Sequence, residues 1–247
     1  TVLGLVFVLM ICALAHDQAQ QLVLWSARLR SQNTHLLRYL PADLSLAGDH
    51  EQTLHMQRSW LTVAFVDLVG FTQLVRTLPT ETVTALLNEF MSEVNHHVEC
   101  WEGQISKFLG DGVLCVYPSP TSGSAKNTAV QAVRCAQLLK QAVAQLHNKS
   151  HFPFELMPLS VTVGIASGYC CVGQIGSVTR LDYTVLGTPV NRAQRLQSVA
   201  KASGGLLIDQ PTAELVAGAV ALDSGTTFDL KGLGATQAFV VVGHDLT

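Results

Sequence analysis

Two aspartates in this sequence stand where carboxylates can hold a metal ion beside a phosphate. Asp67 follows an apolar segment, residues 61–66, and Asp111 lies between two glycines. Carboxylates at neighbouring strand ends are suitable ligands for Mg²⁺, and two such ions can stabilise both the attacking and the leaving oxygen of an in-line displacement. Either aspartate alone would as readily cap a helix or fill a turn, so the prediction depends on the pair.

The residues that follow Asp67 are suited to bind an anion. Gly70 lets the chain turn, because glycine adopts backbone conformations that other residues avoid. If a helix begins after this turn, the amides of Phe71 and Thr72 lie at its N-terminus, where N–H groups attract a phosphate. Phe71 and Thr72 are therefore predicted to contact the substrate.

Asn191 and Arg195 are four residues apart and share one face of a predicted helix. An Arg guanidinium fits a phosphoryl group whose charge is redistributed in the transition state, and an Asn side chain can orient a sugar oxygen. Both are predicted to be catalytic. Arg192 is a second candidate for binding the phosphate. The alternative is that this helix face is polar only because it is exposed to solvent.

Lys107 and Thr184 are suited to hydrogen-bond a nucleobase. The Lys107 ammonium only donates and suits an acceptor such as adenine N1, whereas the Thr184 hydroxyl both donates and accepts. Outside such a site, Lys107 would be a charge on an edge strand and Thr184 a β-branched strand residue. Only the combination with the residues above favours substrate binding.

The composition limits the possible functions. The chain has 247 residues, enough for one substantial core, of which 48% are hydrophobic and only 13% are charged. This balance favours membrane association. The formal net charge of −3 offers no basic surface for sequence-independent binding, so nucleic acid is not an expected partner.

The six cysteines show no CxxC spacing, and most lie in apolar, periodic segments. This pattern indicates buried thiols in a reducing compartment. Cys170 and Cys171 are adjacent on a predicted strand and would point to opposite faces, which argues against joint metal ligation.

The first 58 residues are predicted to precede the catalytic part. Residues 2–15 are apolar, and we interpret 1–15 as a truncated membrane helix, since a bilayer span needs roughly 20 apolar residues. A signal-peptide core and an apolar helix docked on the protein are the alternatives. Residues 16–58 are predicted to be a linker. A heptad pattern, which indicates either a short dimerising helix or a plain amphipathic linker, is formed by Leu22, Trp25, Leu29, Leu36 and Tyr39.

Residues 59–243 are predicted to form one domain, followed by a tail at 244–247. The hydrophobic periodicity of residues 59–243 predicts an α/β (α+β) sandwich, which is a mostly antiparallel sheet with flanking helices. The expected strands are 61–66, 104–109, 113–117, 159–165, 170–175, 206–208 and 238–242. The expected helices lie near 83–101, 129–146, 190–200 and 212–216. Two hairpins are predicted, one with Asp111 near its tip and one that turns around Gly168.

Three segments of this sequence resemble the catalytic domain of class III nucleotidyl cyclases. They are residues 65–72, 107–111 and 182–196, which match in order and spacing. The resemblance covers about residues 60–242 and implies the ferredoxin-like core of that family.

This resemblance implies a head-to-tail homodimer with its active sites at the subunit interface. Asp67 and Asp111 of one chain would hold two Mg²⁺ or Mn²⁺ ions on the triphosphate of ATP. In the other chain, Lys107 and Thr184 would select the base. Asn191 of that chain would position the ribose, and Arg195 would stabilise the transition state. The ribose 3′-hydroxyl would attack the α-phosphorus and give 3′,5′-cyclic AMP and pyrophosphate.

Thr184 departs from the animal adenylate cyclases, which carry Asp at that position, and resembles bacterial-type domains that carry Thr. Guanylate cyclases usually place Glu at the position of Lys107, so ATP is the expected substrate and GTP the alternative. A cytoplasmic catalytic domain, at a cell inner membrane or plasma membrane, follows from the ATP substrate and the cysteines.

A catalytically silent module for signalling or dimerisation is an alternative from a different functional class. Such a module would be expected to lose a metal aspartate or the arginine, whereas this chain keeps Asp67, Asp111 and Arg195. The Gly-Gly-Asp/Glu-Glu-Phe signature of diguanylate cyclases is absent from the sequence, which argues against that class.

Overall fold

The structure is a computed structural model that describes residues 56–119, 123–146, 159–177, 180–203 and 205–242. These residues belong to one compact unit, Glu51–Thr247. The predicted membrane helix at 1–15, the tail at 244–247 and the linker as far as residue 55 lie outside the described residues. No helix in the described ranges is long and apolar enough to cross a bilayer.

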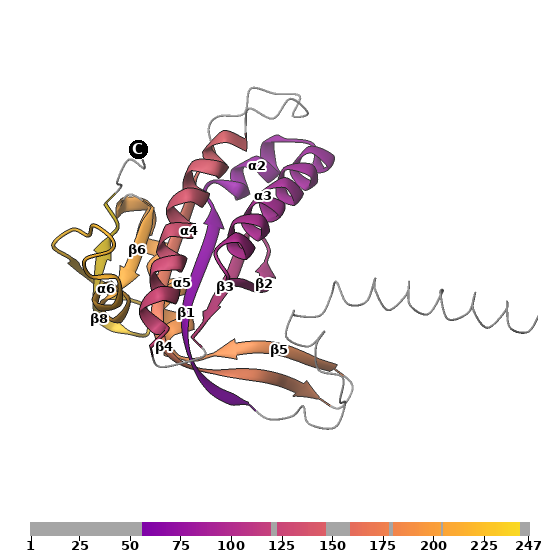
Figure 1. The fold of residues 1–247 in the computed structure, drawn as a ribbon. Helices are drawn as coiled ribbons and strands as arrows, with labels where there is room; N and C mark the ends of the chain where they lie inside the picture. Colours follow the sequence, from indigo (N-terminus) through magenta and orange to yellow (C-terminus); the bar gives the residue numbers. More distant parts are fainter. Residues whose placement is uncertain (1–55, 120–122, 147–158, 178–179, 204, 243–247) are drawn as a thin grey trace, which may run out of the picture. The chain divides into compact units, whose positions relative to one another are not determined.

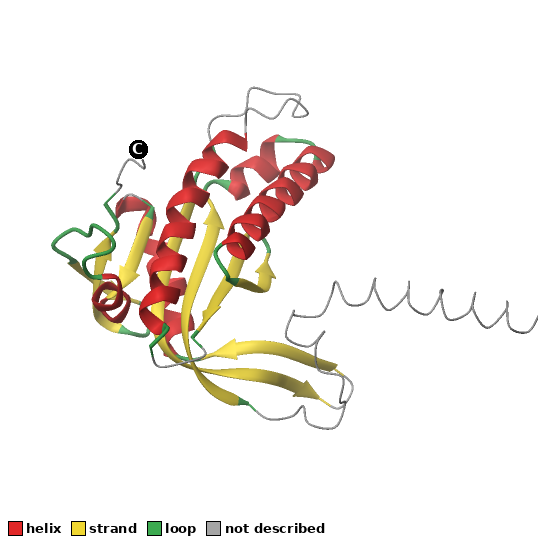
Figure 2. Ribbon diagram, viewed as in Figure 1, coloured by secondary structure: helices red, strands yellow, loops and turns green. Residues whose placement is uncertain are grey.

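The described strands form one mostly antiparallel sheet with helices packed on it, as the sequence predicts (Figures 1 and 2). The strand order is β2-β3-β1-β4-β6-β8-β7, and β5 pairs with β4 outside this path. Among the described pairs only β4 and β6 run parallel. The strands are β1 (Gln57–Leu68), β2 (Gln104–Leu109), β3 (Gly112–Pro118), β4 (Val161–Ser177), β5 (Arg180–Leu186), β6 (Leu206–Asp209), β7 (Thr226–Leu230) and β8 (Gly234–Val240).

The two longest described helices, α3 (Thr80–Cys100) and α4 (Ala125–Gln145), lie side by side on one face of the sheet (Figure 1). Each buries one stripe of side chains at helical spacing, which in α3 consists of Val83, Leu86, Phe90, Val94 and Val98. The shorter elements are α2 (Phe71–Thr77), α5 (Thr188–Ala200), the 3₁₀ turn η3 (Lys201–Ser203) and α6 (Gln210–Val216).

Strand β1 separates two cores, because successive side chains point to opposite faces of a sheet. The residues that pack with α3 and α4 are Ala64, Val66 and Leu68. The residues that pack on the other face, together with Ala193 of α5, are Leu61, Val63 and Phe65. Asp67 continues this second set and therefore lies on the α5 side of the sheet.

The prediction of a hairpin around Gly168 is wrong, because β4 runs without interruption through this residue. A Cβ atom at Gly168 would lie 2.9 Å from Cγ of Pro189, so glycine here makes room for α5 rather than for a turn. The chain reverses later, and Ser177 pairs with Arg180 of β5, a strand that the sequence patterns missed. Along β4, Cys170 is buried and Cys171 exposed, as the alternation of a strand predicts.

Helix α5 approaches β4 closely at a second glycine. A Cβ atom at Gly164 would lie 2.1 Å from the Ala193 carbonyl oxygen and 2.3 Å from the Gln197 amide nitrogen. No side chain can occupy this space without moving the helix. Gly164 therefore sets how near the helix that carries Asn191 and Arg195 lies to the central strands.

Candidate active site

The structure brings Asp67 and Asp111 together at one end of the central strands. Strands β1 and β3 are antiparallel, and Asp67 is the partner of Gly112, the residue after Asp111. A Cβ atom at Gly112 would lie 3.2 Å from Oδ1 of Asp67, so the glycine leaves space around that oxygen. The hairpin between β2 and β3 places Asp111 at its turn, as the sequence predicts.

The electrostatics of this pair suit a cation. Burial raises the pKa of Asp67 above its usual value, the nearby Asp111 carboxylate raises it further, and a hydrogen bond from Gln197 opposes the rise. A divalent cation would relieve the repulsion between two carboxylates. Within the described ranges no group of three or more His, Cys, Asp or Glu side chains converges, so these two residues could supply only part of a coordination shell.

A cleft of about 270 Å³ opens beside Asp67. It is lined by Asp67, Leu68, Val69, Gly70, Thr162, Gln197, Ser198 and Lys201. Gly70 has the left-handed conformation, with φ 80°, and is the N-cap of α2. The amides of Phe71 and Thr72 are the first two of that helix and so have no acceptor within it. The structure therefore places these amides next to a cleft that holds a carboxylate and an ammonium group.

Asn191 and Arg195 project from the outward face of α5. The buried residues of this helix are Pro189, Ala193, Leu196 and Ala200, and Asn191 is exposed. In the described part of the chain, neither the Asn191 side chain nor the Arg195 guanidinium has a hydrogen-bond or ion-pair partner. Both remain available for a ligand.

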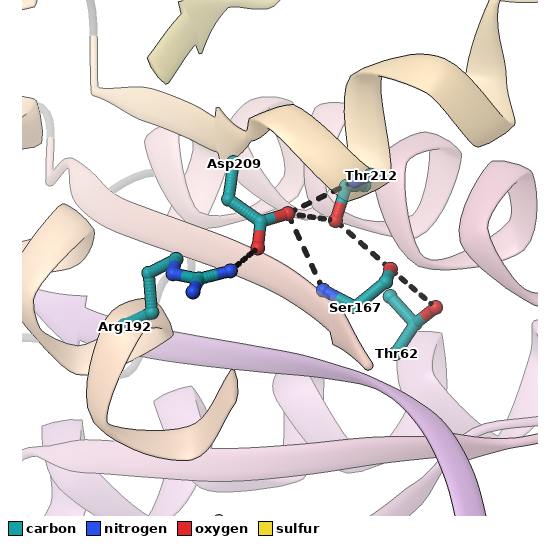
Figure 3. A network of polar contacts seen from close by, with 5 residues as sticks. All are labelled: Thr62, Ser167, Arg192, Asp209 and Thr212. Carbon is teal, nitrogen blue, oxygen red and sulfur yellow. Dashed lines mark hydrogen bonds and ion pairs between the residues drawn. The ribbon is translucent and has the colours of Figure 1, made fainter. Parts of the chain in front are cut away.

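Arg192, the competing candidate for the phosphate, is bound inside the protein. Its guanidinium donates a 2.8 Å hydrogen bond to the buried carboxylate of Asp209 at the end of β6 (Figure 3). Asp209 also caps α6 by accepting from the Thr212 amide at 3.0 Å and from its hydroxyl. Because Arg192 is held by Asp209, Arg195 is the better placed of the two for a phosphoryl group.

The contacts around Asp209 extend through the core to the central strand. The amide of Ser167 in β4 donates to Asp209 at 3.3 Å, and the Ser167 hydroxyl contacts those of Thr212 and Thr62, each at 2.9 Å (Figure 3). Burial raises the pKa of Asp209, while Thr212 and Arg192 oppose the rise. This network, which ties α5 to β6, β4 and β1, has no counterpart in the sequence predictions.

Lys107 contacts the strand that carries Thr184 by pairing with a third residue, Asp182. The Lys107 ammonium forms a 2.5 Å ion pair with Asp182 of β5, and Thr184 lies two residues further along the same strand. Alternate residues of a strand share a face, so Asp182 and Thr184 point to the same side. Asp182 was missed by the sequence analysis because its partner is 75 residues away.

A single chain does not assemble the whole predicted site. Gln197, which hydrogen-bonds Asp67, is only two residues after Arg195 on α5. Residues two apart on an α-helix point about 160° away from each other. Arg195 therefore faces away from the aspartates of its own chain, and Asn191 shares its face.

A sheet with α5 on one face and α3 and α4 on the other, with one aspartate near the end of β1 and a second in the adjacent β2–β3 turn, is the arrangement of class III nucleotidyl cyclases. The sequence matches the family described as "Adenylate and Guanylate cyclase catalytic domain" over residues 55–243. The chain belongs to this family. The predicted family and fold class are confirmed.

Similar proteins include both functional branches. The adenylyl cyclase CyaB from P. aeruginosa is 33% identical with a TM-score of 0.70, covering 78% of this chain and 98% of that chain. The guanylyl cyclase Cya2 is 28% identical with a TM-score of 0.66, covering 78% and 97%. An uncharacterized protein of Mycobacterium tuberculosis, Rv1320c, is 34% identical over 169 residues, which are 66% of this chain and 27% of that protein. The chain thus spans about a quarter to a third of the curated relatives it matches.

Two residues of the cleft, Gln197 and Lys201, were missed by the sequence analysis. Lys201 lies just after α5 and lines the cleft with Asp67, where an ammonium group can contact a phosphate. Lys201 is four residues after Gln197, one helical turn further along, so both can lie on the same side. Gln197 gave no signal, because its partner Asp67 is 130 residues away.

Proposed function

We propose that this protein is an adenylate cyclase that converts ATP to 3′,5′-cyclic AMP and pyrophosphate at the interface of a homodimer. The observation that carries the proposal is the placement of the two aspartates on one side of α5 and of Arg195, which has no partner among the described residues, on the other. Two copies of the chain arranged head to tail would each supply what the other lacks.

Asp67 and Asp111 would hold two Mg²⁺ or Mn²⁺ ions, which supply Lewis-acid stabilisation of the attacking and leaving oxygens. Lys201 lines the cleft and Phe71 and Thr72 directly follow Gly70 of its lining, so the ammonium and these two amides would contact the triphosphate. These contacts fix the phosphates so that the ribose oxygen attacks in line.

The second chain would supply the remaining groups. The side chain of Asn191 would orient the ribose by a hydrogen bond, and the Arg195 guanidinium would stabilise the charge that develops on the transferred phosphoryl group. In the described structure neither side chain has a competing partner.

The base preference follows from the donor and acceptor pattern at Lys107 and Thr184. Adenine presents an acceptor at N1, which the Lys107 ammonium satisfies, whereas guanine presents an N–H donor there. The Thr184 hydroxyl can accept from the adenine amino group. The likeness to a protein named adenylyl cyclase supports ATP, and the likeness to one named guanylyl cyclase keeps GTP as the alternative.

A dimer is supported by exposed apolar side chains on β2 and on the β4–β5 ribbon. They are Phe108, Leu109, Tyr169, Ile175 and Leu186, each 41% to 56% exposed. Large apolar side chains exposed to solvent are candidates for burial in an interface. The proposal also keeps the predicted organisation of the chain. Residues 1–15 would attach it to a membrane, residues 16–58 would form a linker, and residues 59–243 would form a cytoplasmic catalytic domain.

Product analysis tests the proposed reaction. The 247-residue chain is incubated separately with ATP and GTP, with Mg²⁺ or Mn²⁺, and the nucleotides are separated by chromatography. We expect cyclic AMP from ATP and none from an Asp111→Ala variant that melts like the wild type. Cyclic GMP alone would assign the guanylate reaction, and no product from a folded dimer would favour a silent module.

Mixing two inactive variants tests the shared site. Asp67→Ala and Arg195→Ala should each abolish turnover. Random exchange between equal amounts should restore about a quarter of the wild-type activity, because half of the dimers then hold one intact site of two. No recovery, when labelled subunits are shown to exchange, would exclude sites shared between chains.

A further inference from the structure

We propose that Gln197 is a positioning residue that orients the metal-binding carboxylate of Asp67. The inference rests on the proposed function, because it concerns the same site. Gln197 lies in the cleft beside Asp67 and contacts it directly. It touches no reacting group itself and would act only through the carboxylate.

The amide of Gln197 holds two strands at once. Its Nε2 donates to Oδ2 of Asp67 at 3.1 Å and to Oγ1 of Thr162 at 2.7 Å. Thr162 is the residue of β4 paired directly with Asp67 of β1. An ionised carboxylate only accepts, so the amide must present its nitrogen, and both N–H groups are then used.

This contact gives the two carboxylate oxygens of Asp67 different surroundings. Oδ2 of Asp67 is bound by Gln197, whereas Oδ1 lies on the side of Gly112, next to Asp111. The amide therefore turns the free oxygen toward the second aspartate, where a shared cation would lie. Hydrogen bonds behind a ligand of this kind fix its orientation and raise metal affinity.

The close approach of α5 at Gly164 makes this reach possible. Because the Gln197 backbone lies against Gly164 of β4, its side chain can extend to Asp67 and Thr162. Gln197 and Arg195 point to nearly opposite sides of α5. In a dimer with shared sites, Gln197 would serve the site of its own aspartates, and Arg195 would serve the other.

Placing Gln197→Met on either chain of a mixed dimer tests the proposal. One chain carries Asp67→Ala and the other Arg195→Ala, so the single intact site uses Asp67 of the Arg195→Ala chain. Gln197→Met on that chain should raise the Mn²⁺ concentration for half-maximal activity about tenfold. The same change on the Asp67→Ala chain, which is the matched control, should leave it unchanged. An equal effect from both chains, or from neither, would overturn the proposal.

Metal binding gives a readout that does not require turnover. Mn²⁺ is titrated by electron paramagnetic resonance into the full chain with 3′-deoxy-ATP, which lacks the attacking hydroxyl. We expect about tenfold weaker Mn²⁺ binding in Gln197→Met and an intermediate loss in Thr162→Val, which removes only the second contact of the amide. Unchanged binding in both variants would refute the role of Gln197.

The two proposals can fail separately. If the mixed dimers regain no activity, the shared site is wrong, and the Mn²⁺ titration of the unmixed chain still decides the role of Gln197. If the mixed dimers are active but Mn²⁺ binding is unchanged, the cyclase site stands and the positioning role is wrong. Thr162→Val serves as the test variant if Gln197→Met does not fold.

Discussion

Replacing Arg192 by methionine should destabilise the fold by about 3 kcal/mol, because it leaves the Asp209 carboxylate buried without its cation. Breaking a buried ion pair typically costs 3–5 kcal/mol. We expect the lower end, since 25% of the Arg192 side chain is exposed and Thr212 and Ser167 still donate to Asp209. For a domain of this size, such a loss lowers the melting temperature by about 6–12 °C.

The loss should shrink as the pH falls. Arg192 lowers the pKa of Asp209, which burial holds above the usual 3.8. Removing Arg192 raises that pKa further, so the ionised carboxylate costs the most stability at neutral pH, and the cost disappears as the folded state takes up a proton. Urea unfolding at pH 7.5 and pH 5.0 should therefore show a smaller difference from wild type at the lower pH.

Two variants make this prediction refutable. Arg192→Met combined with Asp209→Asn removes the buried charge and should be more stable at pH 7.5 than Arg192→Met alone. Arg76→Met removes an exposed arginine of α2 and should change stability by about 0.5 kcal/mol or less. A loss for Arg192→Met below about 1 kcal/mol, or one that is equal at both pH values, would refute the reasoning.

Three further predictions follow from the site and the fold. Gly164→Ala should cost about 3 kcal/mol in urea unfolding and reduce turnover, because its Cβ would meet the α5 backbone at 2.1 Å; wild-type stability would show that the helix can shift freely. Lys107→Ala should lower kcat/KM for ATP about 10- to 100-fold, and that for GTP less, by loss of a charged hydrogen bond; an equal loss for both would remove Lys107 from base selection. Phe108→Glu should weaken dimerisation in sedimentation velocity by placing a charge on an exposed apolar surface, with Val75→Glu as an equally accessible control; unchanged association would exclude this surface.

The parts of the site that could be predicted are those encoded locally. Asp67 follows its own strand, Asp111 lies in a glycine turn, and Asn191 and Arg195 are one helical turn apart, so each arrangement follows from backbone geometry over a few residues. The antiparallel sheet and its flanking helices were predicted for the same reason. Lys107 and Thr184 were predicted to bind the substrate only in combination with these other residues.

The parts that could not be predicted depend on contacts between distant segments. Gly168 reads as a turn in the sequence, yet its role is to admit Pro189 against a continuous strand. The partners Gln197 with Asp67 and Arg192 with Asp209 are fixed only once α5 lies on the sheet. No local pattern distinguishes Arg192 from Arg195, whereas the fold pairs Arg192 with a buried carboxylate and gives Arg195 no partner among the described residues.

The uninterrupted strand β4 also fixes the distance between Asp67 and Thr184 in one chain. Thr162, near its start, pairs with Asp67, and Gly173, eleven residues later, pairs with Thr184. At ~3.3 Å per residue, this separates Asp67 from Thr184 by roughly 36 Å along the strand. An extended nucleoside triphosphate is shorter than that span. Under the proposed function, one ATP molecule would therefore contact Asp67 of one chain and Thr184 of another, and the length of β4 would prevent catalysis by an isolated subunit.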